Sequence, residues 1–160
     1  MMKDTYYELN ELAARSGYVD LIDVEAFREE ERTSEEIRKL QSAGVHVIAS
    51  FHNFDRTPDR EELIRRLTRM QEMGADVAKI AVMPQSREDV MTLMEATMEA
   101  DHSLDIPVVT MSMGRLGVLS RLAGTLTGSA MTFASVGEAS APGQIPIEQM
   151  RVFCQLLSMK

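Results

Sequence analysis

The sequence predicts an α/β fold in which parallel strands alternate with helices, either as part of a (β/α)₈ TIM barrel or as an open, doubly wound five-stranded sheet. Five short apolar segments are expected to be strands: residues 19–25, 45–51, 77–84, 107–113 and 130–135. Their starts, near residues 19, 45, 77, 107 and 131, are 24 to 32 residues apart, a spacing typical of βα units joined by right-handed crossovers. They are apolar on both faces, as a sheet covered by helices requires.

The segments around the strands carry helix signals. The expected helices cover residues 5–15, 34–44, 57–74, 86–100, 116–126 and 147–157. Gly17 is expected to end the first helix, and the Ser-Glu-Glu-Ile sequence at 34–37 resembles a capping box that starts the second. Pro58 and Asp59 open the third helix. Apolar residues at helical spacing support the fourth.

The length of the chain bounds the architecture. A full barrel usually needs about 250 residues, so this chain of 160 residues is roughly three βα units short. The sequence contains no Pro- or Ser-rich linker and no low-complexity segment. We therefore expect residues 1–160 to form one incomplete barrel domain.

The composition excludes several classes of function. The chain is 44% hydrophobic and 26% charged, with a formal net charge of -8, and no Lys/Arg cluster is interleaved with aromatic residues. Nucleic-acid binding is therefore not expected. Its apolar runs are too short to cross a bilayer, and no signal-peptide pattern opens it, so a cytoplasmic location is the expectation. The single cysteine, Cys154, cannot form an internal disulfide.

Lys79 lies inside the third expected strand, among apolar residues that run from Val77 to Met83. Lysine is almost never fully buried unless it is paired or has a function. A desolvated ammonium has a depressed pKa, and the free amine can attack a ketone or aldehyde to form a Schiff base. The structural alternative is a lysine near a strand end that extends to water.

Other polar side chains lie where the first two expected strands end, which is where parallel α/β folds place their chemistry. Asp23 and Glu25 are two residues apart and therefore share one face, and His52 follows the second strand. Neighbouring strands are about 4.8 Å apart, so His52 and Lys79 can meet in one pocket. An imidazole there can remove and return protons beside an iminium. As an alternative, Asp23 and Glu25 form structural ion pairs or caps.

No metal or cofactor is expected. His46 and His52 point to opposite ends of one strand and lack a third ligand nearby. The sequence contains no phosphate-cradling or dinucleotide-binding loop. The loop at 137–144, which combines two glycines and a proline with small residues, is expected to be either a mobile lid or an ordinary connector.

Six collinear motifs together resemble type I 3-dehydroquinate dehydratase over nearly the whole chain. They are IDVE at 22–25, SFHNF at 50–54, KIAVMP at 79–84, TMSMG at 110–114, SRLAG at 120–124 and ASAPGQ at 139–144. That family has a (β/α)₈ barrel and acts in the shikimate pathway, where it dehydrates 3-dehydroquinate to 3-dehydroshikimate. The resemblance implies the same reaction here, with 3-dehydroquinate as the small-molecule partner and without a metal or an organic cofactor.

The resemblance also implies roles for individual residues. Lys79 is expected to form the Schiff base with the substrate ketone. His52 is expected to move the C2 proton to the leaving C1 hydroxyl and to assist imine formation and hydrolysis. Arg121 is expected to bind the substrate carboxylate. The other implied substrate-binding residues are Ser140 and Gln144 in the last loop, Asp23 and Glu25 as polar positions, and Met111, Met113 and Phe133 as apolar lining.

By analogy, the chain starts just before the helix that precedes the family's fourth strand. The glutamate that orients the catalytic histidine is expected to lie in the absent units, and Asn53 stands where the family often has aspartate. Open sheet edges favour self-association, and the full-length family is commonly dimeric, so a homodimer is expected. The alternative is a truncated, catalytically impaired remnant that acts only as a fold fragment or interaction module.

Overall fold

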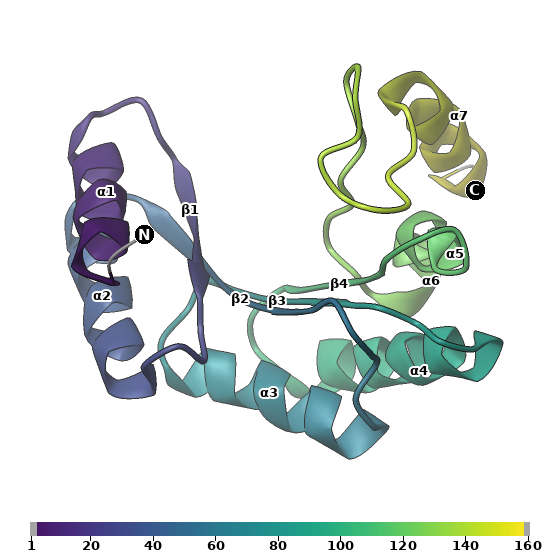
Figure 1. Cartoon of the computed structure of the whole chain (residues 1–160), viewed down its shortest axis with the longest axis horizontal. Coiled ribbons are helices and arrows are strands. Elements are labelled where there is room, and N and C mark those ends of the chain that lie inside the picture. The colour runs from purple at the N-terminus through teal and green to yellow at the C-terminus, as the bar shows by residue number, and fades with distance from the viewer. Residues whose placement is uncertain (1–2, 159–160) are drawn as a thin grey trace.

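A parallel four-stranded sheet in the order β1-β2-β3-β4 organises the chain (Figure 1). The strands are β1 (Leu21–Glu25), β2 (His46–Asn53), β3 (Val77–Val82) and β4 (Val108–Ser112). The computed structural model describes residues 3–158. Within that range each strand pairs in parallel with the next strand along the chain. This topology confirms the predicted α/β class and is the one expected of a partial barrel.

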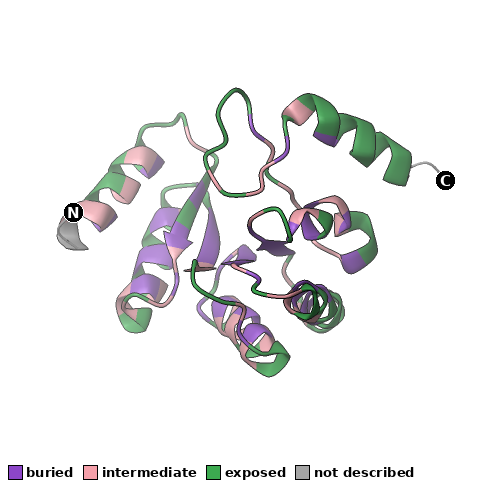
Figure 2. Cartoon of the chain, turned by 45° about the vertical axis from the view of Figure 1, so that its right-hand side comes forward, coloured by how far each residue is buried: buried purple, intermediate pink, exposed green. Residues whose placement is uncertain are grey.

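Helices alternate with the strands, and three of them cover one side of the sheet. The helices are α1 (Lys3–Arg15), α2 (Glu30–Ser42), α3 (Arg60–Glu72), α4 (Arg87–Ser103), α5 (Val118–Leu122), α6 (Gly124–Thr127) and α7 (Ile147–Ser158). Helices α2, α3 and α4 connect successive strands and pack against them, while α1 packs against α2. In Figure 1, α3 and α4 lie beneath the sheet. Helix α7 is exposed along most of its length (Figure 2).

The sheet buries apolar side chains on both faces. On the face toward the helices, strand residues such as Val47 and Ile80 belong to a large apolar cluster with Leu67 and Leu93. We call the opposite side the inner face, and it carries a smaller apolar cluster. That cluster consists of Ile48, Val77, Ala81, Val109, Met111 and Met113. Because both faces are covered, every residue of β3 is buried.

The prediction of a fifth strand at 130–135 is wrong. The segment starts beside β4, where the Ala130 N–H donates to the Val108 carbonyl at 2.8 Å. The Ser129 hydroxyl accepts from the Thr110 N–H at 3.0 Å and so takes the place of the next backbone partner. Further along, only an isolated bridge forms, between Ser135 and Pro146. A side chain and the returning loop thus satisfy backbone groups that a fifth strand would use.

Two helix predictions also need correction. The second helix begins at Glu30 rather than at Ser34, and no capping box forms at 34–37, because the Ser34 hydroxyl donates to the Glu30 carbonyl inside the helix. The Glu- and Arg-rich run before it consists of good helix formers, which extends the helix toward its N-terminus. The predicted helix at 116–126 is divided into α5 and α6 around Ala123. The predicted opening of α3 is confirmed, since the Asp59 side chain accepts from the Glu62 N–H.

One buried carboxylate destabilises this fold at neutral pH. Glu36 on α2 is 2% exposed, and its Oε1 has no hydrogen-bond partner among the described residues. Burial raises the pKa of Glu36, and repulsion from Glu11 raises it further, against smaller opposing effects of Lys39 and Arg32. The folded chain therefore holds the Glu36 proton more tightly than the unfolded chain does. The protonated Glu36 side chain therefore contributes its full stability below the ordinary pKa. This contribution is lost as the pH rises through the pKa of Glu36 in the folded chain.

We expect Glu36→Gln to raise the free energy of unfolding by about 1 kcal/mol near neutral pH, because it removes the buried charge. The gain should vanish at about pH 4, below the ordinary pKa of 4.5, where Glu36 is protonated in both states. Urea unfolding of both proteins at the two pH values measures this. The exposed neighbour Glu35, changed to Gln, is the control. An advantage of equal size at both pH values would contradict the assignment.

Candidate active site

Polar side chains gather on the inner face of the sheet, toward the C-terminal ends of the strands. Side chains alternate along a strand, so β1 presents Asp23 and Glu25 on the inner face and β2 presents Ser50 and His52. The strand register places Lys79 of β3 directly beside Ser50. The inner apolar cluster shares this face, with Ile48 and Val77 toward the start of the strands and Ala81 and Met111 beside the polar layer. The polar layer therefore has an apolar floor.

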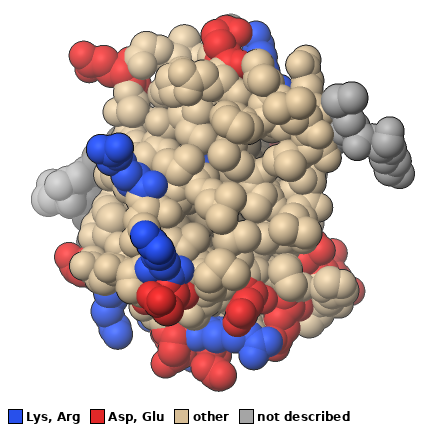
Figure 3. All heavy atoms as spheres, turned by 90° about the vertical axis from the view of Figure 1, so that its right-hand side faces the viewer, with Lys and Arg blue, Asp and Glu red and all other residues tan. Residues whose placement is uncertain are grey.

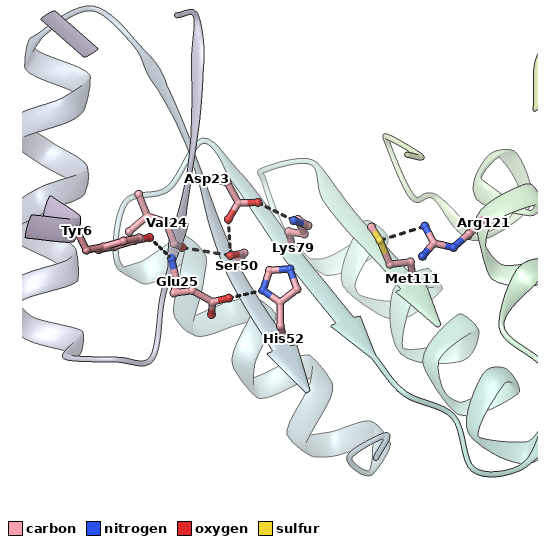
Figure 4. Close-up of polar contacts among 9 residues, drawn as sticks. All are labelled: Tyr6, Asp23, Val24, Glu25, Ser50, His52, Lys79, Met111 and Arg121. Atoms are coloured by element: carbon pink, nitrogen blue, oxygen red, sulfur yellow. Dashed lines mark hydrogen bonds and ion pairs between the residues drawn. The ribbon is translucent and has the colours of Figure 1, made fainter. Parts of the chain in front are cut away.

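Lys79 is held in this layer by a carboxylate. Its side chain is 11% exposed, and Nζ donates to Asp23 Oδ2 at 2.6 Å (Figure 4). The ammonium also lies 5.2 Å from the ring centroid of Phe133, which lines the same cavity. The Asp23 carboxylate accepts a second hydrogen bond, from the Ser50 hydroxyl. Lys79 is thus a buried lysine with Asp23 as its charge partner, and this ion pair offsets part of the cost of burying the ammonium.

His52 is oriented by Glu25. Nδ1 of the imidazole contacts Glu25 Oε1, and in Figure 4 the other ring nitrogen is turned toward Lys79. A carboxylate on Nδ1 fixes the tautomer and leaves Nε2 free to exchange protons. The Glu25 backbone is itself fixed, since its N–H donates to the Tyr6 hydroxyl of α1 at 3.1 Å. The Phe54 ring stacks parallel to the imidazole, with centroids 6.1 Å apart. The expectation that His52 would lack its orienting carboxylate is therefore wrong.

Arg121 is a buried cation without an acidic partner among the described residues. The residue is 3% exposed, and burial lowers the pKa of its guanidinium. Nη2 donates to the Pro142 carbonyl at 3.1 Å and Nη1 approaches the Met111 sulfur at 3.6 Å, while Nε has no partner in the part of the chain described. Unpaired buried charges are costly, so a guanidinium in this state is suited to receive an anion.

A cavity of about 290 Å³ connects these groups. Its lining consists of His52, Phe54, Lys79, Ala81, Met111, Met113, Arg121, Phe133, Ser140, Ala141, Pro142 and Gln144. Eight of the ten predicted site residues are among them. The other two, Asp23 and Glu25, do not line the cavity and lie behind Lys79 and His52, which they contact. The cavity therefore presents an amine, an imidazole and a guanidinium to one small molecule.

The loop at 136–144 covers this cavity from the side of β4. Gln144 Oε1 accepts from both the N–H and the hydroxyl of Ser140, at 2.8 and 3.2 Å. The Gly114 N–H, just after β4, donates to the Pro142 carbonyl at 3.1 Å. A Cβ on Gly143 would lie 2.3 Å from the Gly114 carbonyl oxygen, so only glycine permits this approach. The loop is thus anchored beside the C-terminal end of β4.

We expect Gly143→Ala to release the loop, because the added methyl collides with backbone rather than with a side chain. Cleavage after Glu138 by a glutamate-specific protease should accelerate at least about fivefold, the effect of roughly 1 kcal/mol on local opening. Gly137→Ala is the matched control, since Gly137 also has a positive φ but has no atom within 4 Å of an added Cβ. If cleavage accelerates equally in both variants, the cause is the strain of a positive φ in alanine and not the collision with Gly114.

Other candidate sites are weaker. Among residues 3–158, no group of three or more His, Cys, Asp or Glu side chains could hold a metal ion. His46 instead lies 3.4 Å from Asp76 at the other end of β2. A larger hollow of about 560 Å³ lies along α3 and α4, but its central charges, Arg60 and Glu99, already pair with each other. No helix among these residues is long and apolar enough to span a membrane.

Sequence reasoning missed three contributors to the site. Tyr6 lies on α1, before the first of the motifs in the sequence, and no local pattern indicates its contact with Glu25. Phe54 stands in the quoted SFHNF motif and could have been considered for that reason. Ser50 precedes His52 by two residues, so strand alternation alone places it on the same face.

The sequence of this chain is similar to those of known proteins. A family model described as type I 3-dehydroquinase matches residues 1–160. The 3-dehydroquinate dehydratase of Listeria welshimeri is 51% identical over 152 residues, which are 95% of this chain and 60% of that protein. The Klebsiella pneumoniae protein of the same name is 51% identical over 156 residues, 97% of this chain and 62% of that one. The chain thus spans about 60% of the length of these curated relatives.

Solved structures give the same result. The crystal structure of 3-dehydroquinate dehydratase from Geobacillus kaustophilus superposes with a TM-score of 0.94 at 44% identity, covering 98% of this chain and 61% of that one. The type I enzyme from Clostridium difficile, described with covalently modified comenic acid, gives a TM-score of 0.93 at 46% identity, covering 98% and 62%. The fold and the order of the motifs are therefore similar over nearly all of the chain.

Proposed function

Because the chain belongs to the type I 3-dehydroquinase family, we propose that it is a Schiff-base 3-dehydroquinate dehydratase that converts 3-dehydroquinate to 3-dehydroshikimate and water in the shikimate pathway. One observation carries the proposal: buried Lys79, Glu25-bound His52 and Arg121, which has no acidic partner among residues 3–158, meet in one cavity. The chain spans about 60% of the relatives' length, so its activity is part of the proposal.

The first chemical step joins Lys79 to the substrate. The Lys79 ammonium must lose a proton before it can attack, and Asp23 Oδ2 at 2.6 Å is positioned to accept it. The amine then attacks C3 of the ketone, and the C3–O bond breaks after the oxygen has been protonated with the help of His52. In total, one ammonium and one ketone give one protonated iminium and one water.

The second step removes water from the ring. The iminium withdraws electrons from C2, so Nε2 of His52 can take the C2 proton and leave an enamine. The enamine electrons form the C1–C2 double bond as the C1–O bond breaks, and the hydroxyl leaves as water with the proton from His52. Hydrolysis of the conjugated iminium consumes one water and restores the lysine. The net change is the loss of one water from the substrate.

The remaining residues hold the substrate. Arg121 pairs with the carboxylate, for which its planar fork is suited, and this contact supplies the acidic partner that the buried guanidinium lacks. Ser140 and Gln144 close over the ring from the loop, and Met111 contributes to the apolar wall. Asp23 and Glu25 act on Lys79 and His52 from behind.

Turnover is the direct test. The purified chain is incubated with 3-dehydroquinate, and the conjugated product is followed by ultraviolet absorbance and by the loss of one water in its mass. Product formation is expected, and it should be absent when Lys79→Met replaces the native chain. A folded chain that yields no product at any concentration would contradict the proposal and leave the remnant alternative.

We also infer that the protein is a cytoplasmic homodimer. The surface that carries α5, α6 and α7 has few charged side chains at its centre (Figure 3). It exposes large apolar residues, including Leu119, Leu126, Val152 and Leu156, each more than half exposed. Apolar patches of this kind favour association. Sedimentation velocity is expected to show a dimer that Val152→Glu or Leu156→Glu dissociates, and a monomeric native chain would contradict the inference.

A further inference from the structure

Ser50 is a buried polar residue for which the proposed reaction has no assigned role. It is fully buried in the middle of the sheet, where the strand register places it between Glu25 of β1 and Lys79 of β3. Its hydroxyl donates to Asp23 Oδ1, and the Val24 carbonyl lies farther away, at 3.5 Å. Asp23 uses its second oxygen to accept from Lys79 at 2.6 Å. The Ser50 hydroxyl therefore contacts the Asp23 carboxylate, which in turn contacts the Lys79 ammonium (Figure 4).

We propose that Ser50 is a positioning residue for Schiff-base formation, and this inference rests on the proposed function. The Ser50 hydroxyl holds the Asp23 carboxylate in the one orientation in which Oδ2 meets Lys79 Nζ. Ser50 does not line the cavity, so it acts on the amine only through Asp23. Its single hydroxyl proton is directed to Oδ1, which leaves Oδ2 free to receive the proton that Lys79 must lose.

The carboxylate needs such a restraint. The Asp23 side chain is 37% exposed, so water can compete for Oδ1 once the Ser50 hydroxyl is removed. The side chain can then rotate, and Lys79, with four rotatable bonds, follows it away from the attack position. Small losses of alignment in a reacting group slow the chemical step strongly. Substrate binding depends on Arg121 and the loop, which Ser50 does not contact, so affinity should be preserved.

The test separates the rate of imine formation from affinity. The chain is mixed with increasing 3-dehydroquinate in the presence of cyanoborohydride, and the reduced Lys79 adduct is quantified by intact mass. Ser50→Ala is expected to lower the maximal trapping rate about tenfold, the usual effect of losing a hydrogen bond to a charged group. The concentration for half-maximal trapping should change less than about twofold. In an Asp23→Asn background, Ser50→Ala should have no further effect.

Ser112→Ala is the matched control. Ser112 is also fully buried, on β4, but it lies on the face toward the helices, and its hydroxyl has no partner among the described residues. The Ser112→Ala variant should form the reduced Lys79 adduct at the native rate. The inference is overturned if Ser50→Ala, shown to be folded by its melting transition, forms the adduct at the native maximal rate. It is also overturned if Ser50→Ala lowers that rate by the same factor in the Asp23→Asn background. A native chain that forms no adduct would instead contradict the proposed function.

Discussion

Replacing His52 by alanine is expected to lower turnover by a factor of about 10² to 10⁴, the usual contribution of a general acid–base group. The substrate iminium should still form, although more slowly, and then accumulate on Lys79, because the amine remains while the group that removes the C2 proton is gone. Stopped samples analysed by intact mass should show a covalent adduct that persists and yields little product. A variant that turns over within about twofold of the native chain would contradict the assignment of His52.

Changing Glu25, the partner of His52, should lower turnover by a smaller factor. Glu25→Gln keeps the shape of the side chain but loses the charge that stabilises the imidazolium, and we expect turnover to fall by about 10- to 100-fold. His46→Ala is the control on the same strand, because His46 lies at the opposite end of β2 and its side chain is 75% exposed. It should leave turnover unchanged. An equal loss in Glu25→Gln and His46→Ala would remove the case for orientation by Glu25.

The second large effect concerns Arg121. Replacing it by methionine is expected to weaken binding of 3-dehydroquinate by about 10² to 10³, since two charge-assisted hydrogen bonds to the carboxylate are lost. The ligand-free variant should nevertheless be at least as stable as the native chain, because a buried charge with no acidic partner among residues 3–158 is replaced by an apolar side chain of similar size. Calorimetric titration and urea unfolding measure the two effects.

Opposite signs for binding and stability distinguish a ligand-binding arginine from a structural one. Arg115→Met is the control for net charge, because Arg115 follows β4 but is exposed. It should bind the substrate normally. If Arg121→Met instead destabilised the chain and bound the substrate with native affinity, the guanidinium would be a structural link to the Pro142 carbonyl and the anion site would lie elsewhere.

Much of the fold follows from local patterns, since the four strands that form were all predicted within about two residues at their starts. The failures have a tertiary origin. At 130–135 the apolar pattern is that of a strand, but the Ser129 hydroxyl and the returning loop at 145–147 take the backbone partners. At 34–37 the capping signature is present, yet the preceding glutamates and arginines continue the helix. Propensity alone does not rank such competing partners.

The candidate site was predictable to a similar extent. Strand alternation and register bring together His52 and Lys79, and the motif resemblance supplied Arg121 and the loop residues. The exact partners were not predictable. Glu25 was expected to line the pocket, whereas it holds His52, and the contact of Tyr6 with Glu25 depends on how α1 packs beside the sheet. Side-chain pairing across elements depends on three-dimensional packing, which a single sequence does not encode locally.

The central claim is that Lys79 forms a Schiff base with 3-dehydroquinate in a formed substrate pocket. Reductive trapping tests it most directly: the chain is mixed with 3-dehydroquinate and cyanoborohydride, digested, and the modified peptide identified by mass spectrometry. The account predicts one adduct, on Lys79, that is absent from Lys79→Ala and suppressed when Arg121 is replaced by methionine. An adduct spread over other lysines, or none in a chain shown to be folded, would contradict it.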